Sequence, residues 1–198
     1  DWLGHRSQMM RRGIAYRGRI TQFFMGIAGG IDVPIPPPLA QGDSFAYTGT
    51  AQHDFIIQTE KFCGPQHGTV LVTLEQLWGE FGNVGFRTGA TPPAVFNAIQ
   101  PVVPDQAGEP YLTNLFYLQP VSRKLILGVG RKKLPSVVDN EIFAGGDGTD
   151  QFVNQGFIAS PAFLALLPIN TFMGTAVMPQ KWGRIAFVVM DPLDRSDK

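Results

Sequence analysis

The feature that most constrains the fold is a long two-residue alternation between residues 45 and 57. The odd positions there are apolar except for His53, whereas Thr, Gln and Asp side chains fill most even positions. This period indicates a β-strand with one apolar and one polar face, and it outlasts the usual strand of a soluble domain. Such a strand suits a wall between lipid and a water-filled lumen, although a soluble β-sandwich alternates in the same way.

The composition favours a β-rich protein with part of its surface out of water. Charged residues make up 16% of the chain, with 23 Gly, 16 Pro and 15 Phe, whereas about a quarter of a typical soluble domain is charged. The 16 basic and 16 acidic residues cancel, so no global field would attract nucleic acid. Cys63 is the only cysteine, which excludes an intrachain disulfide and a CxxC zinc site.

The sequence predicts neither a secretory signal nor a membrane-spanning helix. Polar and basic residues follow the opening Asp1-Trp2-Leu3-Gly4, so we expect a protein that is either cytosolic or begins after processing. The most apolar stretch, residues 23–40, is broken by glycines, Asp32 and four prolines. A chain of this kind would cross a membrane as strands.

Alternation and turn residues predict about eight strands in the chain. A short N-terminal arm occupies residues 1–13, and residues 79–110 form a long loop. The expected strands are 14–26, 45–58, 69–78, 111–119, 124–131, 152–159, 171–178 and 184–191, with a short helix at 136–143. Tight turns are expected at 120–123 and 179–183. Short turns at one end of the strands and long loops at the other are typical of an outer-membrane barrel.

Several short motifs resemble the carbohydrate-selective porin family of Gram-negative outer membranes, the OprB-type porins. The motifs are Asp1-Trp2-x-Gly4-x-Arg6, Leu127-Gly128-Val129-Gly130-Arg131, Phe143-Ala144-Gly145-Gly146 followed by Gln151-Phe152-x-Asn154, and Val189-Met190-Asp191-Pro192-x-Asp194. Together they span nearly the whole chain, which is similar to the N-terminal portion of this family.

The resemblance implies an all-β fold, an antiparallel transmembrane β-barrel of roughly sixteen strands. Residues 1–198 would then be the N-terminal portion of a single barrel domain, about half of it. We expect a longer protein, because half a barrel has two edge strands whose backbone N–H and C=O groups would be unpaired in lipid. The resemblance also implies an outer-membrane location, contact with outer-membrane lipid, a homotrimer, and passive diffusion of carbohydrate and other small hydrophilic solutes, without catalysis or a cofactor.

On this interpretation a polar set of side chains faces the lumen. The candidate pore-lining residues are Arg17, Arg19, Asp54, Glu75, Trp78, Lys124 and Arg131. Basic donors and acidic acceptors would bind the hydroxyl groups of a neutral sugar, and an aromatic ring would contact its C–H surface. The alternative for each residue is a solvated position on a wet wall, with no selective role.

Two other function classes fit parts of the pattern. A soluble β-sandwich carbohydrate-binding module would use Trp78 and Trp182 as platforms. An acidic-residue glycosidase would need Asp54 and Glu75 about 5 to 10 Å apart in a cleft. The first of these is the main alternative to a porin.

Metal ligands are not predicted. His53 lies on the apolar side of its strand and is expected to be a hydrogen-bonded histidine. An acidic cluster in the 139–150 loop, formed by Asp139, Glu141, Asp147 and Asp150, raises the idea of calcium, but its spacing differs from that of an EF-hand loop.

Overall fold

The structure, a computed structural model, describes residues 2–26, 45–79, 109–133, 170–181 and 183–191. Their strands form one antiparallel sheet in chain order. The strands are β1 (Ile14–Gly26), β2 (Phe45–Gln58), β3 (Thr69–Gly79), β4 (Tyr111–Ser122), β5 (Leu125–Lys133), β6 (Asn170–Gln180) and β7 (Gly183–Met190). The helix α1 (His5–Arg11) and two 3-10 turns, η1 (Trp2–Gly4) and η2 (Thr59–Phe62), are the other described elements.

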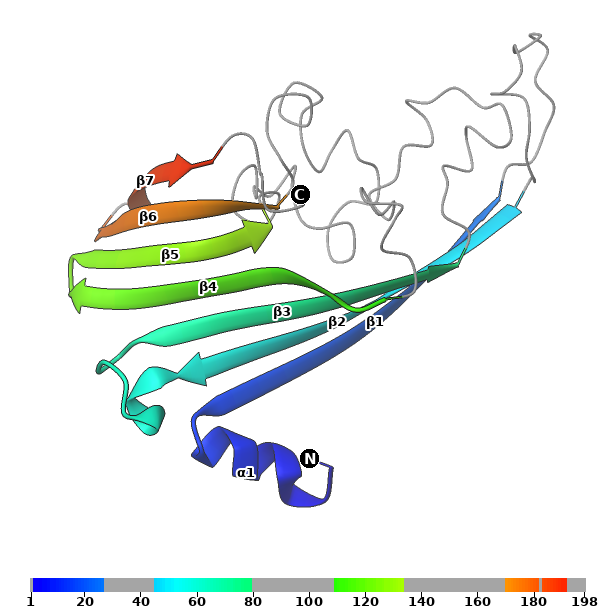
Figure 1. Ribbon diagram of the computed structural model, residues 1–198, viewed down its shortest axis with the longest axis horizontal. Coiled ribbons are helices and arrows are strands. Elements are labelled where there is room, and N and C mark those ends of the chain that lie inside the picture. Colours follow the sequence, from blue (N-terminus) through cyan, green and yellow to red (C-terminus); the bar gives the residue numbers. More distant parts are fainter. Residues whose placement is uncertain (1, 27–44, 80–108, 134–169, 182, 192–198) are drawn as a thin grey trace, which may run out of the picture.

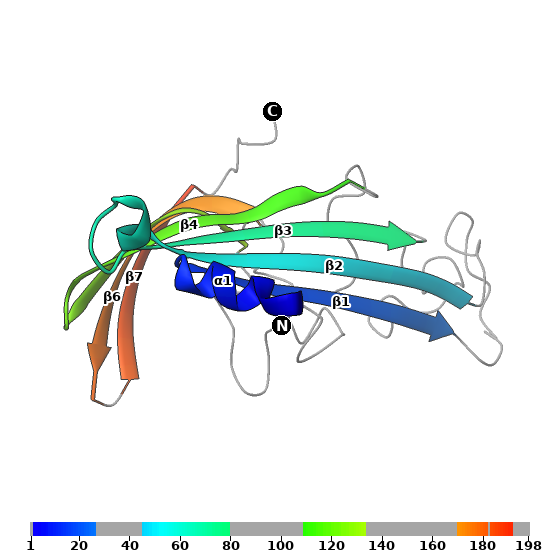
Figure 2. The ribbon, with the colours of Figure 1, turned by 90° about the horizontal axis from the view of Figure 1, so that it is seen from below.

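The sheet is open and strongly curved. Figure 1 shows the strands side by side from β1 to β7, and in Figure 2 β6 and β7 turn steeply away from β1, β2 and β3. Within the described residues β1 and β7 are the two edges, each paired with a single neighbour. Adjacent strands twist in one sense, and the twist accumulates across the sheet. This arrangement confirms the all-β, antiparallel prediction, and the described strands form one open sheet.

Seven of the predicted strands are present, with ends that differ by up to three residues from those expected. The predicted strand at 152–159, the helix at 136–143, the acidic cluster at 139–150 and nearly all of the 79–110 loop lie outside the described residues. The turn predicted at 120–123 was wrong in position. β4 continues through Ser122, and the turn consists of Arg123 and Lys124. A register shift after Pro120 makes room for a residue that cannot donate a backbone hydrogen bond.

The N-terminal arm is anchored at the point where α1 gives way to β1. Gly13 has a φ of +86°, a left-handed conformation that glycine adopts without strain. Its carbonyl oxygen accepts a 2.8 Å hydrogen bond from the backbone N–H of Gln58. The helix lies beside β1 (Figure 2). None of the helices within the described residues combines the length and apolar character needed to span a membrane.

The ladders place two different sets of side chains on the two faces of the sheet. Tyr16, Ile20 and Phe24 of β1 share one face, whereas Arg17 and Arg19 share the other, as the alternation predicts. We call the first the apolar face and the second the polar face. Many of the large side chains on the apolar face are exposed. They include Val189 (77% exposed), Ile20 (70%), Phe24 (66%), Phe187 (61%) and Val129 (60%).

The tightest apolar packing lies on the polar face, beyond its charged part. Phe116 of β4 and Met173 of β6 are each 3% exposed, and Leu71, Leu118, Val188 and Met190 pack around them. Gly130, which pairs with both, has a φ of +141°, and a Cβ there would collide with the carbonyl oxygen of Leu115. The glycine therefore allows β4 and β5 to approach closely at this point.

Candidate functional site

Polar side chains form two neighbouring rows across β1 to β4, on the polar face. One row is Arg17, Asp54, Thr73 and Asn114, and the next is Arg19, Gln52, Glu75 and Tyr111. With Lys133, which reaches Glu75 from the end of β5, these residues form what we call the polar cluster. Each strand contributes because residues two apart share a face and paired residues stand side by side.

Arg19, Gln52, Asp54 and Thr73 are joined by a chain of hydrogen bonds. Nη2 of Arg19 donates to Oε1 of Gln52 at 2.5 Å. Nε2 of Gln52 donates to both carboxylate oxygens of Asp54, at 3.1 and 3.3 Å. Oγ1 of Thr73 donates to Oδ1 of Asp54 at 2.8 Å. Donor and acceptor alternate along this chain, so its members hold one another in place across three strands.

Glu75 is the centre of a second, more deeply buried group. It is 5% exposed, and Nζ of Lys133 lies 3.1 Å from its Oε2 and 3.3 Å from its Oε1. The hydroxyl of Tyr111 donates to Oε2 at 3.2 Å. Both carboxylate oxygens therefore have partners within the chain. This arrangement suits a structural ion pair and offers little to a solute or to a reaction that needs a general acid.

The groups that a solute could reach are those at the β1 side of the cluster. Arg17 is exposed, and Arg19, Gln52 and Asp54 are half-buried. They offer guanidinium and amide donors next to carboxylate and amide acceptors. Sugar hydroxyl groups both donate and accept, so such a mixed surface fits a neutral, hydroxyl-rich solute better than an anion or a cation.

Trp78 lies on the apolar face, away from the polar cluster. It pairs with Gly49 in the ladder, and its Nε1 donates a 3.0 Å hydrogen bond to the hydroxyl of Tyr47. A Cβ on Gly49 would overlap the indole. The sheet thus separates Trp78 from the charged candidates, because residues 75 and 78 are an odd number of positions apart in one strand.

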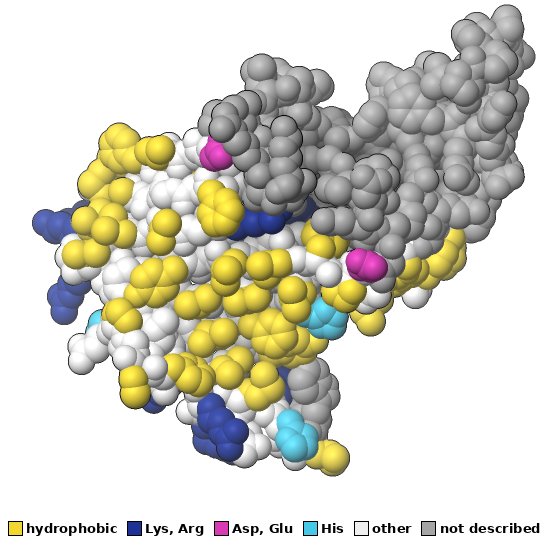
Figure 3. All heavy atoms as spheres, viewed as in Figure 1, with side chains coloured by type: hydrophobic (Ala, Val, Ile, Leu, Met, Phe, Trp, Pro, Cys, Tyr) yellow, Lys and Arg dark blue, Asp and Glu magenta, His cyan; other side chains and the backbone are white. Residues whose placement is uncertain are grey.

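Other aromatic residues gather on the same face. Tyr16 packs against Phe55 with ring centroids 5.0 Å apart, and its hydroxyl lies 2.7 Å from Nδ1 of His53. The expectation of a hydrogen-bonded His53 is confirmed. Phe24 packs against Tyr47, also at 5.0 Å between centroids. Figure 3 shows this face, with hydrophobic side chains spread over the strands.

Lys124 and Arg131 are also outside the polar cluster. Lys124 is an exposed residue of the turn between β4 and β5. This turn follows the last residue of β4, whereas Tyr111 of the polar cluster is the first residue of that strand. Arg131 pairs with Leu115 and Phe172, two exposed residues of the apolar face. Of the seven candidates, the structure therefore brings together Arg17, Arg19, Asp54 and Glu75.

Lys133 and Tyr111 were not among the candidates. Lys133 is 58 positions from Glu75 in the sequence, and Tyr111 becomes a neighbour of Glu75 only through irregular strand pairing. A register shift between β3 and β4 at Thr73 and Leu74 leaves one residue of β4, Thr113, unpaired between Leu112 and Asn114. The shift changes which residues of β4 share a face, and strict alternation from either neighbour does not reveal it.

The described residues contain no group of three or more His, Cys, Asp or Glu side chains that could hold a metal ion. The acidic residues of the 139–150 loop are outside that part of the chain.

Comparison with known proteins gives a structural match. No protein-family model matches the sequence, and no curated protein does. Among solved structures, OprB of Pseudomonas putida, determined at high pH, superposes with a TM-score of 0.67 at 15% sequence identity. The match covers 97% of this chain and 44% of that chain, so the chain spans less than half the length of OprB. The resemblance to an OprB-type porin is confirmed at the level of the fold: the chain has the all-β fold of part of OprB.

Proposed function

We propose that this chain is the N-terminal portion of an outer-membrane porin, through which sugars and other small hydrophilic solutes diffuse passively. The observation that carries the proposal is the division of one sheet into an exposed apolar face and a hydrogen-bonded polar face. A soluble protein rarely leaves a large contiguous apolar patch in water. Strands that are apolar on one side and polar on the other are typical of a wall between lipid and an aqueous lumen.

The polar cluster would line the aqueous path in this proposal. Arg17 and Arg19 supply fixed donors, while Asp54 and Gln52 supply acceptors on the adjoining strand. The chain of hydrogen bonds through Thr73 holds Arg19, Gln52 and Asp54 in position before a solute arrives. The guanidinium groups of Arg17 and Arg19 and the carboxylate of Asp54 place charges of both signs on neighbouring strands, which suits a neutral, hydroxyl-rich solute. We propose that the ion pair between Glu75 and Lys133 has a structural role and stabilises the sheet.

A soluble carbohydrate-binding module is less well supported. A β-sandwich covers its apolar face with a second sheet, whereas the seven described strands belong to one sheet whose apolar side chains are exposed. The glycosidase alternative is also weakened, since both oxygens of Glu75 are held by Lys133 and Tyr111.

The test uses the intact gene product that contains this chain, purified in detergent and reconstituted in liposomes. We expect heat-resistant β-structure in detergent, osmotic swelling in the presence of glucose, and a single-channel conductance that added sugar reduces. The Asp54→Asn and Arg19→Gln variants should weaken the sugar effect and shift ion selectivity in opposite directions. Glu60→Gln, an exposed change in η2, should do neither. A protein that remains soluble without detergent and forms no channel would rule out the porin proposal.

A further inference from the structure

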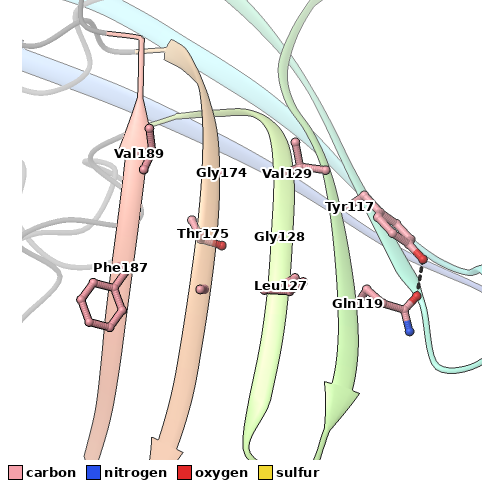
Figure 4. Close-up of a pocket in the computed structure, with 10 residues that line it drawn as sticks. Tyr117, Gln119, Leu127, Gly128, Val129, Gly174, Thr175, Phe187 and Val189 are labelled. Carbon is pink, nitrogen blue, oxygen red and sulfur yellow. Dashed lines mark hydrogen bonds between the residues drawn. The ribbon is translucent and has the colours of Figure 1, made fainter.

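A hollow of about 510 Å³ lies on the apolar face, between β5 and β7. Two ladder rows cross it, and in each a small residue of β6 stands between large residues of its neighbours. One row is Val129, Gly174 and Val189, and the other is Leu127, Ala176 and Phe187. Figure 4 shows Val129 and Leu127 on one side and Val189 and Phe187 on the other, with β6 between them. We call this hollow the β6 groove.

The β6 groove is a space that the strands leave open. A Cβ built on Gly174 would meet nothing within 4 Å. Along β6 the groove is lined by residues 174 to 176, and alternation puts the large residues Phe172 and Met178 on the same face, beyond the two ends of that stretch. Their Cα atoms are six residues apart, which is about 20 Å along a strand. The side chains that line the groove are mainly apolar, which suits the end of a hydrocarbon chain.

The charges of the surrounding hairpins are all of one sign. Between residues 111 and 133 and between residues 170 and 190 no acidic residue occurs. The basic residues of these two ranges are Arg123, Lys124, Arg131, Lys132, Lys133, Lys181 and Arg184. Lys133 is paired with Glu75, and the ammonium of Lys132 lies 5.5 Å from the centre of the Phe116 ring.

Three of the basic residues lie in the tight turns that join β4 to β5 and β6 to β7, at one end of the groove. They are Arg123, Lys124 and Lys181, and all three are exposed. Basic side chains appear along the turn edge of the sheet in Figure 3. Within the described residues their side chains form no ion pair. A cluster of basic residues at the edge of an apolar surface attracts anionic lipid headgroups.

We propose that the β6 groove binds one acyl chain of an anionic phospholipid, whose phosphate lies against Arg123, Lys124 and Lys181. Dimensions agree with this assignment. The turn end of β6 is about 20 Å along the strand from Gly174. At the tilt of about 40° common in such sheets, this corresponds to a depth of about 15 Å, half of a hydrocarbon core of about 30 Å. A lipid with its headgroup at the turns would place the end of its chain over Gly174 and Ala176.

Charge also distinguishes this occupant from a second copy of the chain. Two copies of these hairpins in contact would oppose basic residues with basic residues, with no acidic residue of either hairpin to offset them. The inference rests on the proposed function in that a porin places this face in a bilayer, and its short turns at the inner side of the outer membrane.

The experiment measures lipid retained by the intact protein in mixed micelles of detergent, dioleoyl-phosphatidylglycerol and dioleoyl-phosphatidylcholine, by native mass spectrometry. The natural protein should retain the anionic lipid at least 10-fold over the zwitterionic one, since each cation near an anionic surface contributes about a factor of five. The triple variant R123Q/K124Q/K181Q should bind phosphatidylglycerol on the order of 100-fold more weakly. Ala176→Leu fills the groove and should reduce retention of both lipids, whereas Ala186→Leu, the same change on the polar face of β7, should not.

A second control removes three exposed cations elsewhere, in R11Q/R12Q/K61Q, and should leave lipid retention unchanged. Equal retention of both lipids by the natural protein would overturn the assignment. So would equal retention of phosphatidylglycerol by the Ala176→Leu and Ala186→Leu variants, or a multimer that Ala176→Leu dissociates. Sugar-driven liposome swelling is measured on the same samples. Lipid retention without swelling would count against the porin proposal alone, and swelling without selective lipid retention against the lipid site alone.

Discussion

The ion pair between Lys133 and Glu75 can show which part of the polar cluster serves the fold. Its charged atoms are 3.1 Å apart, and the side chains of Lys133 and Glu75 are 22% and 6% exposed. At an effective dielectric constant of about 20, the Coulomb attraction at this distance is about 5 kcal/mol before desolvation is subtracted. Removing one partner of a buried pair typically costs about 3 to 5 kcal/mol, because the other charge stays desolvated and unpaired.

The two single removals should differ in cost. Lys133→Met leaves the carboxylate of Glu75 nearly buried, and among the described side chains the Tyr111 hydroxyl is then its one remaining partner. We therefore expect the free energy of unfolding to fall by about 3 kcal/mol. Glu75→Gln leaves an ammonium group that retains some access to solvent, and the expected loss is about 1 to 2 kcal/mol. The double variant should be more stable than Lys133→Met alone, since it removes the orphaned carboxylate as well.

Unfolding of the intact protein by urea in detergent micelles, followed by circular dichroism, measures these free energies. Glu60→Gln is the matched control, because the ion pair of Glu60 with His67 spans 3.7 Å and both side chains are exposed. An exposed pair of this kind contributes no more than about 0.5 kcal/mol. A structural role for this ion pair is contradicted if Lys133→Met leaves stability unchanged but alters sugar flux, or if Glu75→Gln costs more stability than Lys133→Met.

Two further predictions test the assignment of the faces. Gly49→Val would push against the indole of Trp78, so we expect altered tryptophan fluorescence and a loss of about 1 to 3 kcal/mol in unfolding free energy; Gly174→Val meets open space and should cause neither. Phe187→Arg should reduce the free energy of folding into lipid vesicles by about 2 to 4 kcal/mol if this side chain faces the bilayer, while Ala186→Arg on the opposite face should cost little. Equal costs for the two arginine variants would contradict the face assignment.

Strands and faces followed closely from the sequence because the signal is local. The alternation around Phe55 and the neighbouring polar residues predicts both the strand and the side to which Asp54 points. Turn positions followed less closely, because a proline favours a turn but does not always end a strand. Pro120 and Pro179 both lie inside paired strands. Tolerance of proline at a bulge or near a strand end depends on the partner strand, which one segment of sequence does not reveal.

The candidate site was only partly predictable, because it too depends on how neighbouring strands pair. Arg17, Arg19 and Asp54 lie on two strands in uninterrupted register, so alternation alone places them together. The partnership of Glu75 with Lys133 spans three strands and passes the register shift at Thr113. Neither the shift nor the reach of a lysine side chain across it has a local sequence signal. Long-range contacts across irregular pairing therefore mark the limit of inference from periodicity.

β4 links the two proposed sites while keeping them apart. Its first residue, Tyr111, belongs to the polar cluster, and its last, Ser122, precedes the basic turn. These residues are eleven positions apart, about 35 Å along the strand. Substitutions that far apart, with no shared partner, usually have additive effects. Changes at Asp54 should therefore alter solute passage without altering lipid retention, and changes at Lys124 should do the reverse. Coupling between the two would mean that the sheet responds to lipid as a single rigid unit, and that bilayer composition regulates the aqueous path.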